Sequence, residues 1–93
     1  MYYLYILECA DGTLYTGITT DLERRLAEHN NSVLGAKYTA ARRPVVLVYS
    51  KKLKNRAAAS REENLIKTLS RTEKLKLILD NRTNQKNKKP RDI

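Results

Sequence analysis

The sequence predicts an α/β domain with a three-stranded, mainly antiparallel sheet flanked by helices, and three observations support this fold. Two short apolar runs, residues 2–9 and 13–18, flank a turn signal, which is typical of a β-hairpin. A third run, residues 45–49, is continuously apolar and indicates a strand covered on both faces. Elsewhere apolar residues recur at helical spacing. A chain of 93 residues makes one domain, which we expect to occupy residues 1–80.

The turn of the hairpin can close in two ways, and the choice decides which side chains share a face. A two-residue turn would pair Tyr5 with Ile18 and put Tyr5 and Tyr15 on opposite faces. A three-residue loop with Gly12 at positive φ pairs Tyr5 with Gly17 instead. We expect the second register, in which the missing side chain of Gly17 leaves room beside the Tyr5 ring for a ligand backbone. This register also gathers a core layer on the other face, consisting of Leu4, Ile6, Leu14 and Ile18.

The segment after the hairpin predicts one helix and one shorter element. Thr20 to Glu23 has the pattern of a capping box, so a helix should begin there and run to about Asn30. Its inward stripe is formed by Leu22 and Leu26. Residues 36–42 are expected to form a short helix or irregular turn that stops before Pro44.

Two further helices are expected in the second half. Asn55 can cap a helix that runs to about Leu69. Ser70 or Thr72 can cap a last helix that runs to about Leu79. The apolar stripe of the first of these helices consists of Ala58, Ala59, Leu65, Ile66 and Leu69, and that of the second of Leu75, Ile78 and Leu79.

Charge points to a polyanionic partner. Nineteen Lys and Arg against ten Asp and Glu give a net charge of +9, which favours nucleic acid first and an acidic membrane second. Residues 81–93 carry five positive charges and one negative, and their polar composition predicts a disordered basic tail.

The cysteine content and the length of the apolar runs bear on the compartment of the protein. The single cysteine, Cys9, cannot form an internal disulfide, which suits a reducing compartment. No apolar run approaches the roughly 20 residues of a membrane span, and the N-terminus does not have the pattern of a signal peptide. We therefore expect a cytoplasmic monomer without membrane contact.

Four side chains are candidates for phosphodiester chemistry: two phenols, Tyr5 and Tyr15, a guanidinium, Arg25, and the only imidazole, His29. Arg25 and His29 are four residues apart, so they should be neighbours on one flank of the first helix. Tyr5 is a poor base at its ordinary pKa near 10. We expect Arg25 and a bound metal to lower that pKa.

These residues resemble the motifs of the GIY-YIG nuclease superfamily, in particular its small single-domain bacterial members. Tyr3-Leu4-Tyr5 stands in place of GIY and Tyr15-Thr16-Gly17 in place of YIG, so Tyr3 and Thr16 depart from the usual Gly and Ile. The resemblance spans residues 1–79. It implies that Tyr5 is the general base, that Tyr15 orients the water or the phosphate, and that Arg25 and His29 hold the phosphate.

A metal ligand is expected at one of two adjacent carboxylates. Glu62 falls near the centre of its helix's apolar stripe and Glu63 at the edge, where a cleft is more accessible. The superfamily's pattern is a Glu followed three and four residues later by an apolar residue and Lys, which Ile66-Lys67 supplies for Glu63. Glu63 is therefore the expected ligand of Mg²⁺ (or Mn²⁺), ions that accept one carboxylate and several waters.

The resemblance implies a metal-dependent DNA endonuclease acting on single-stranded or branched DNA, as in DNA repair. DNA is favoured over RNA, and a separate targeting partner is a further expectation. The alternative is a non-catalytic module of the same fold that binds DNA or ribosomal RNA. The residues expected to contact nucleic acid are Tyr3, Gly17, Lys37, Tyr38, Arg42 and Arg43, with Thr39 in the same hydroxyl-rich segment.

Overall fold

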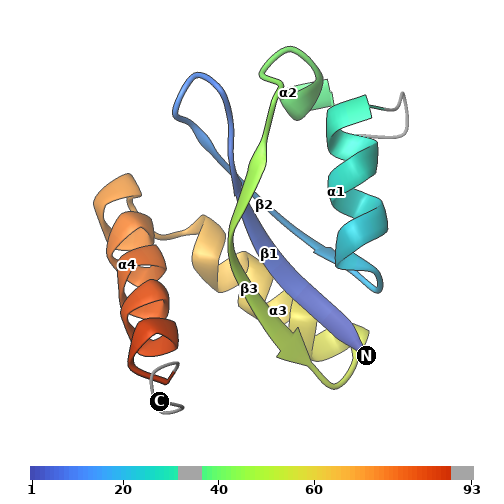
Figure 1. Cartoon of the computed structure of the whole chain (residues 1–93). Coiled ribbons are helices and arrows are strands. Elements are labelled where there is room, and N and C mark those ends of the chain that lie inside the picture. Colours follow the sequence, from blue (N-terminus) through green and yellow to red (C-terminus); the bar gives the residue numbers. More distant parts are fainter. Residues whose placement is uncertain (32–36, 89–93) are drawn as a thin grey trace.

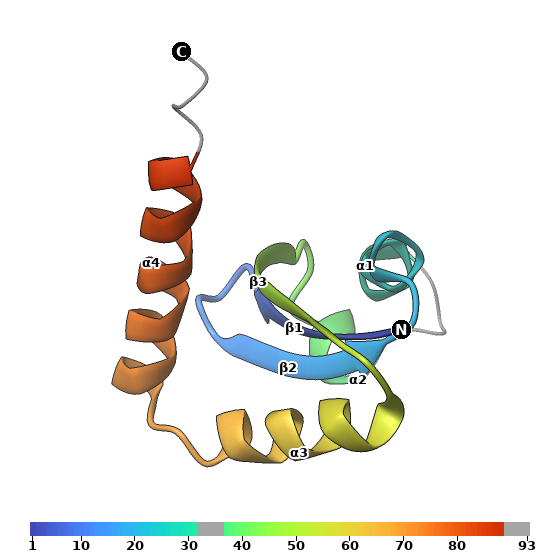
Figure 2. The same cartoon turned by 90° about the horizontal axis from the view of Figure 1, so that it is seen from below.

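A single sheet with helices on both of its faces organises the chain (Figure 1). The computed structural model describes residues 1–31 and 37–88, with side chains through residue 81. The strands and helices are β1 Tyr2–Glu8, β2 Leu14–Thr19, α1 Leu22–Asn31, α2 Lys37–Ala40, β3 Val46–Leu53, α3 Arg56–Lys67 and α4 Arg71–Lys88. Seen along the sheet, α1 lies on one side and α3 on the other, while α4 stands at the edge of the molecule away from α1 (Figure 2).

The strand order is β2-β1-β3, and β1 is antiparallel to both neighbours, as the sequence predicts. The hairpin has the three-residue loop: the Cys9 N–H donates to the Thr13 carbonyl at 2.8 Å, and Gly12 has a φ of 86°. Tyr5 is therefore paired with Gly17, and Leu7 with Tyr15. The expected register is confirmed, and both phenols lie on one face of the sheet.

Each face of the sheet packs its own core. One face contributes Leu4 and Ile6, which pack with Ile66 of α3 and Ile78 of α4. The other face contributes Tyr5, Leu7 and Cys9, and the stripe of α1 covers them through Leu22 and Leu26. The predicted core layer is confirmed, because Leu14 and Ile18 pack against the first cluster. The functional face is the one covered by α1.

The first helix begins where expected but with a different cap. The Asp21 carboxylate accepts the Arg24 backbone N–H at 3.1 Å, so Asp21, rather than Thr20, caps α1. At the other end, the Asn30 amide bonds both backbone groups of Val45, at 2.8 and 3.0 Å, and fixes α1 against the start of β3. The short helix expected in residues 36–42 is present as α2.

The second half departs from the sequence prediction in its exposed apolar residues. Asn55 and Ser70 are the caps of α3 and α4, since they accept the N–H groups of Ala58 and Glu73. The buried apolar stripes of α3 and α4 contain fewer residues than predicted. The buried contacts of these helices with the first core cluster are made by Ile66 of α3 and Ile78 of α4. The predicted core positions that are exposed instead are Leu65, Leu75 and Leu79.

Helix α4 also continues past Leu79 to Lys88, so residues 81–88 are helical where disorder was predicted. This segment lacks a helix breaker, because the next proline is Pro90, and Lys, Arg and Gln are good helix formers. Residues 89–93 lie outside the described part of the chain. The prediction that residues 1–80 form the domain stays a prediction.

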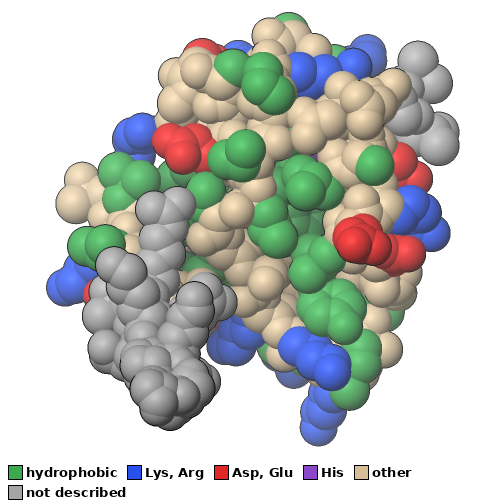
Figure 3. Space-filling view, viewed as in Figure 1, with side chains coloured by type: hydrophobic (Ala, Val, Ile, Leu, Met, Phe, Trp, Pro, Cys, Tyr) green, Lys and Arg blue, Asp and Glu red, His purple; other side chains and the backbone are tan. Residues whose placement is uncertain are grey.

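Strand β3 is longer and more exposed than predicted. It runs to Leu53, and only Val48 of its first residues is buried, whereas Val46 and Leu47 are exposed. One face of its N-terminal half is thus open, and Figure 3 shows apolar side chains gathered over β3. In the described parts of the chain, none of the helices has the length and apolar character needed to cross a bilayer.

Candidate active site

The site is built around the pairing of Tyr5 with Gly17. The Tyr5 ring lies across Gly17, so a Cβ placed on this glycine would come within 2.5 Å of the phenol oxygen. The room beside Gly17 is therefore filled by Tyr5 itself, and the expectation that a ligand backbone occupies it is wrong. Tyr5 is almost fully buried and Tyr15 is half-buried, with ring centroids 6.4 Å apart. Gly17 thus serves to seat the Tyr5 phenol.

His29 joins the two phenols from α1. Its side chain is completely buried, and Nε2 lies 2.9 Å from the Tyr5 hydroxyl. The Tyr15 ring meets the imidazole edge at a centroid distance of 5.1 Å. The spacing of Leu22 and Leu26 turns this flank of α1 toward the sheet, which explains why a residue at the end of the helix is buried.

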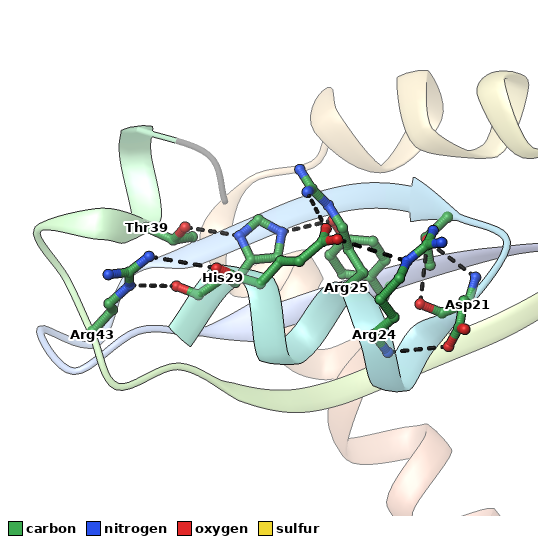
Figure 4. Close-up of polar contacts among 9 residues, drawn as sticks. Asp21, Arg24, Arg25, His29, Thr39 and Arg43 are labelled. Carbon is green, nitrogen blue, oxygen red and sulfur yellow. Dashed lines mark hydrogen bonds and ion pairs between the residues drawn. The ribbon is translucent and has the colours of Figure 1, made fainter. Parts of the chain in front are cut away.

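Thr39 completes the surroundings of the imidazole from α2. Its buried hydroxyl lies 2.8 Å from His29 Nδ1, so both ring nitrogens have a partner (Figure 4). Among the described residues, no buried side-chain nitrogen or oxygen is left without a hydrogen bond. The sequence predicts Thr39 as part of a basic binding segment and gives no link to His29, because ten residues separate the two along the chain.

His29 is neutral at physiological pH. Burial, the nearby Arg25 charge and, to a lesser degree, Arg43 lower the pKa of His29 from 6.5 to about 4, against an opposing effect of Glu28. A neutral imidazole has one donor and one acceptor nitrogen. It can therefore donate toward one of its two hydroxyl partners and accept from the other.

Arg25 fixes which way the proton on Tyr5 points. Arg25 hydrogen bonds the Tyr5 phenol, and a guanidinium has only donors, so the phenol oxygen accepts this bond. The arrangement that satisfies every group has the Tyr5 O–H donating to His29 Nε2 and Nδ1–H donating to Thr39. Tyr5, His29 and Thr39 then form a directed hydrogen-bond relay.

The pKa of Tyr5 moves opposite to the expectation. Burial raises it above its ordinary value of 10; the hydrogen bond from Arg25 lowers it by a smaller amount, and the charge of Glu63 raises it further. The phenol therefore keeps its proton in the free protein. Arg25 also donates to Glu28 at 2.8 Å, a contact that the sequence analysis missed. The negative charge of the Glu28 carboxylate offsets part of the positive charge of Arg25.

A stack of planar groups leads outward from Tyr15. The Tyr38 ring is stacked on Tyr15 with centroids 5.8 Å apart, and the Arg42 guanidinium lies 4.1 Å from the Tyr38 centroid. We call these three residues the Tyr15–Tyr38–Arg42 stack. The structure thus brings Tyr38 and Arg42, both predicted to contact nucleic acid, next to the candidate catalytic residues.

The remaining predicted contact residues are dispersed. Arg43 donates to the carbonyls of His29 and Glu28, which places it at the C-terminal end of α1. Lys37 is exposed at the start of α2. Tyr3 is half-buried on the same strand face as Tyr5, two residues away on β1. Their contact with nucleic acid stays a prediction.

The two carboxylates of α3 have different surroundings. Glu62 is half-buried, pairs with Lys51 at 3.3 Å and lines a hollow on the β3 side. Glu63 pairs with Lys67 at 3.2 Å, and its charge acts on Tyr5. Of the two carboxylates, Glu63 is thus the one whose charge is seen to act on Tyr5.

Glu63 suits a largely hydrated ion better than a closed metal cage. Nowhere in residues 1–31 and 37–88 do three side chains of His, Cys, Asp or Glu gather as a metal site. Mg²⁺ is commonly held by one or two carboxylates and keeps several waters. An ion at Glu63 would therefore be one that keeps most of its waters.

The chain is similar to known proteins in sequence. Residues 1–76 match the family model described as the GIY-YIG catalytic domain. The chain is 54% identical over 77 residues to a UPF0213 protein of Desulfotalea psychrophila, covering 83% of this chain and 70% of that protein. It is 52% identical over 79 residues to a UPF0213 protein of Syntrophus aciditrophicus, covering 85% and 91%.

Two solved structures are also similar. The solution structure of a UPF0213 protein from Bacillus halodurans matches with a TM-score of 0.54 and 47% identity, over 84% of this chain and 83% of that one. The solution structure of an E. faecalis protein matches with a TM-score of 0.61 and 43% identity, over 88% and 86%. The names of these relatives state no activity.

Proposed function

The chain belongs to the GIY-YIG catalytic domain family, and from this premise we propose that it is a metal-dependent endonuclease that hydrolyses phosphodiester bonds of DNA, on single-stranded or branched substrates. The observation that carries the proposal is the buried Tyr5–His29–Thr39 relay with Arg25 beside it. A relay of this kind gives a proton a defined path, which a binding module does not need.

In the proposed mechanism, Tyr5 acts as a base without first becoming a phenolate. It gains one proton as it passes another on. Its oxygen takes a proton from the attacking water while its own proton moves to His29 Nε2 across 2.9 Å. Tyr5 stays neutral throughout, so the raised pKa of the free phenol does not block the step. The hydroxide left from the water bonds to phosphorus as the leaving oxygen departs, and the proton ends on His29, which becomes an imidazolium. Because Tyr5 is only 2% exposed, substrate binding has to open a path for one water beside the ring.

Arg25 and Tyr15 hold the phosphate in this proposal. His29, which the sequence resemblance assigns to the phosphate, is completely buried with both ring nitrogens bonded, so it is given the relay role instead. Arg25 donates to Glu28 through Nη1 and hydrogen bonds the Tyr5 phenol, and its planar guanidinium group suits a non-bridging phosphate oxygen. Tyr15 is half-buried and more accessible than Tyr5. Its hydroxyl is the phenol that we expect to orient the phosphate or the water.

Glu63 would hold Mg²⁺ or Mn²⁺, which supplies positive charge to stabilise the transition state when bound. The contribution of the chain is to present one carboxylate whose charge acts on Tyr5. Lys67, four residues on, would be displaced from Glu63 or remain as its second partner.

The alternative, a non-catalytic nucleic-acid-binding module, is favoured by one observation. In the described residues no three side chains of His, Cys, Asp or Glu gather to retain a metal. The same basic fold would then bind DNA or ribosomal RNA through its net charge of +9.

Cleavage of labelled single-stranded, duplex and branched DNA, with and without Mg²⁺, separates the two. Glu63→Ala should abolish metal-dependent cleavage and leave binding within about twofold, since binding rests on dispersed Lys and Arg. Glu62→Ala is the matched control and should retain activity. If Glu62→Ala is inactive and Glu63→Ala active, the choice of carboxylate is wrong. If the wild type binds but never cleaves, the binding module is the correct function.

A further inference from the structure

The Tyr15–Tyr38–Arg42 stack has one end in the candidate active site and the other in solvent. Tyr15 lies 5.1 Å from the His29 ring centroid, and Tyr38 follows it at 5.8 Å. At the outer end, Tyr38 is 39% exposed and the Arg42 side chain 35% exposed. The stack is therefore a continuous path of flat groups from the proposed reaction centre to the surface.

The guanidinium at the outer end is held in a fixed plane. Its Nε donates to the Asp11 carboxylate at 3.1 Å, and its Nη1 donates to the Tyr38 carbonyl at 2.8 Å. Asp11 is itself fixed by the backbone N–H and hydroxyl of Thr13, at 3.1 and 2.7 Å. The Arg42 backbone is also tied to the hairpin, since its carbonyl accepts the Ala10 N–H at 2.9 Å.

These contacts argue against an ordinary phosphate contact for Arg42. Asp11 offsets its charge, and two donors of its fork are already used. What remains available is the flat face of the group. Planar guanidinium groups and tyrosine rings are the surfaces on which unstacked nucleobases pack. The arrangement thus suits a base better than a phosphate.

We propose that the flat face of Arg42, supported by the Tyr38 ring beneath it, forms a platform for one unpaired nucleobase near the scissile phosphate. The bases of a continuous duplex are stacked on one another, so only a single strand, flap or loop can place a base there. The platform therefore selects single-stranded or unpaired nucleic acid. This inference rests on the proposed function and names the substrate class of the same site.

The test measures binding without cleavage. Fluorescence anisotropy is recorded in the Glu63→Ala background, without divalent metal, with an oligothymidylate and with a duplex of equal length. Arg42→Lys keeps the charge and the reach to Asp11 but loses the planar group. We expect it to weaken single-strand binding about tenfold and duplex binding less than about twofold. Tyr38→Leu is a second variant for the same platform and should give the same pattern.

The matched control is Arg56→Lys, the same exchange at an exposed position at the start of α3. β3 pairs its Leu53 with Tyr2 just before α3, so Arg56 lies at the end of the sheet opposite the hairpin loop. It should change neither affinity. Equal losses on both nucleic acids, or no loss in either platform variant, would overturn the platform. If the parent protein binds neither nucleic acid, the proposed function itself fails, a result that this comparison distinguishes from failure of the platform alone.

Discussion

The protonation of His29 gives a sharp test of the buried relay. Its pKa is lowered from 6.5 to about 4, first by burial and then by Arg25. In the unfolded chain the imidazole takes up a proton near pH 6.5, whereas in the folded protein it does so only near pH 4. Between these values the unfolded state binds more protons, so the free energy of unfolding falls as pH falls.

The difference between 6.5 and about 4, at about 1.4 kcal/mol for each pH unit, amounts to about 3.5 kcal/mol in full, of which about 3 kcal/mol is lost by pH 4. Carboxylates also titrate in this range, so the wild type is compared with His29→Gln. Urea unfolding is measured at pH 7 and at pH 4. The decrease in the free energy of unfolding between these two pH values should be about 3 kcal/mol larger for the wild type than for His29→Gln. Above pH 6.5 the two curves should run parallel.

A direct measurement is available because His29 is the only histidine. Its ring proton resonances in an NMR titration belong to one residue, and their midpoint reports its pKa. A midpoint close to 6.5 would show that the imidazole is solvated. The tautomer and the direction of the relay would then have no support.

Three further predictions test the same geometry. Gly17→Ala should lower the free energy of unfolding by about 1–3 kcal/mol, since the new Cβ would lie 2.5 Å from the Tyr5 oxygen; wild-type stability would show that the ring moves freely. Thr39→Val should cost about 1–3 kcal/mol by leaving His29 Nδ1 unpaired, and should slow cleavage, whereas Thr39→Ser restores both. Removal of residues 81–93 should flatten the log–log salt dependence of nucleic-acid binding by at most about 4, and an unchanged slope would make this segment a bystander.

The hairpin was predictable because local chemistry determines it. Gly12 tolerates positive φ, and the alternation of apolar residues excludes a shift of one position. These two facts alone pair Tyr5 with Gly17 and bring Tyr15 to the same face. The placement of the two phenols therefore needed no knowledge of the rest of the fold.

The residues that complete the site were not predictable in the same way. Thr39 reaches His29 from another helix, and nothing in a sequence separation of ten residues fixes that contact. Glu28 is visible as a helical neighbour of Arg25, yet the sequence cannot say whether Arg25 turns to it or to the sheet. The exposure of Leu65 and Leu79 likewise depends on how each helix is rotated against the sheet.

Burial has opposite effects on the two groups of the relay, and this decides how the site can work. It raises the pKa of Tyr5 and lowers that of His29, so the proton stays on the phenol and the imidazole stays neutral. In the free protein at neutral pH, neither a phenolate nor an imidazolium is therefore present before substrate binds. The remaining path is a transfer in which Tyr5 accepts one proton as it gives another to Nε2. Such a step needs the relay intact at the moment of reaction, which is why Thr39, remote from any phosphate, should affect cleavage.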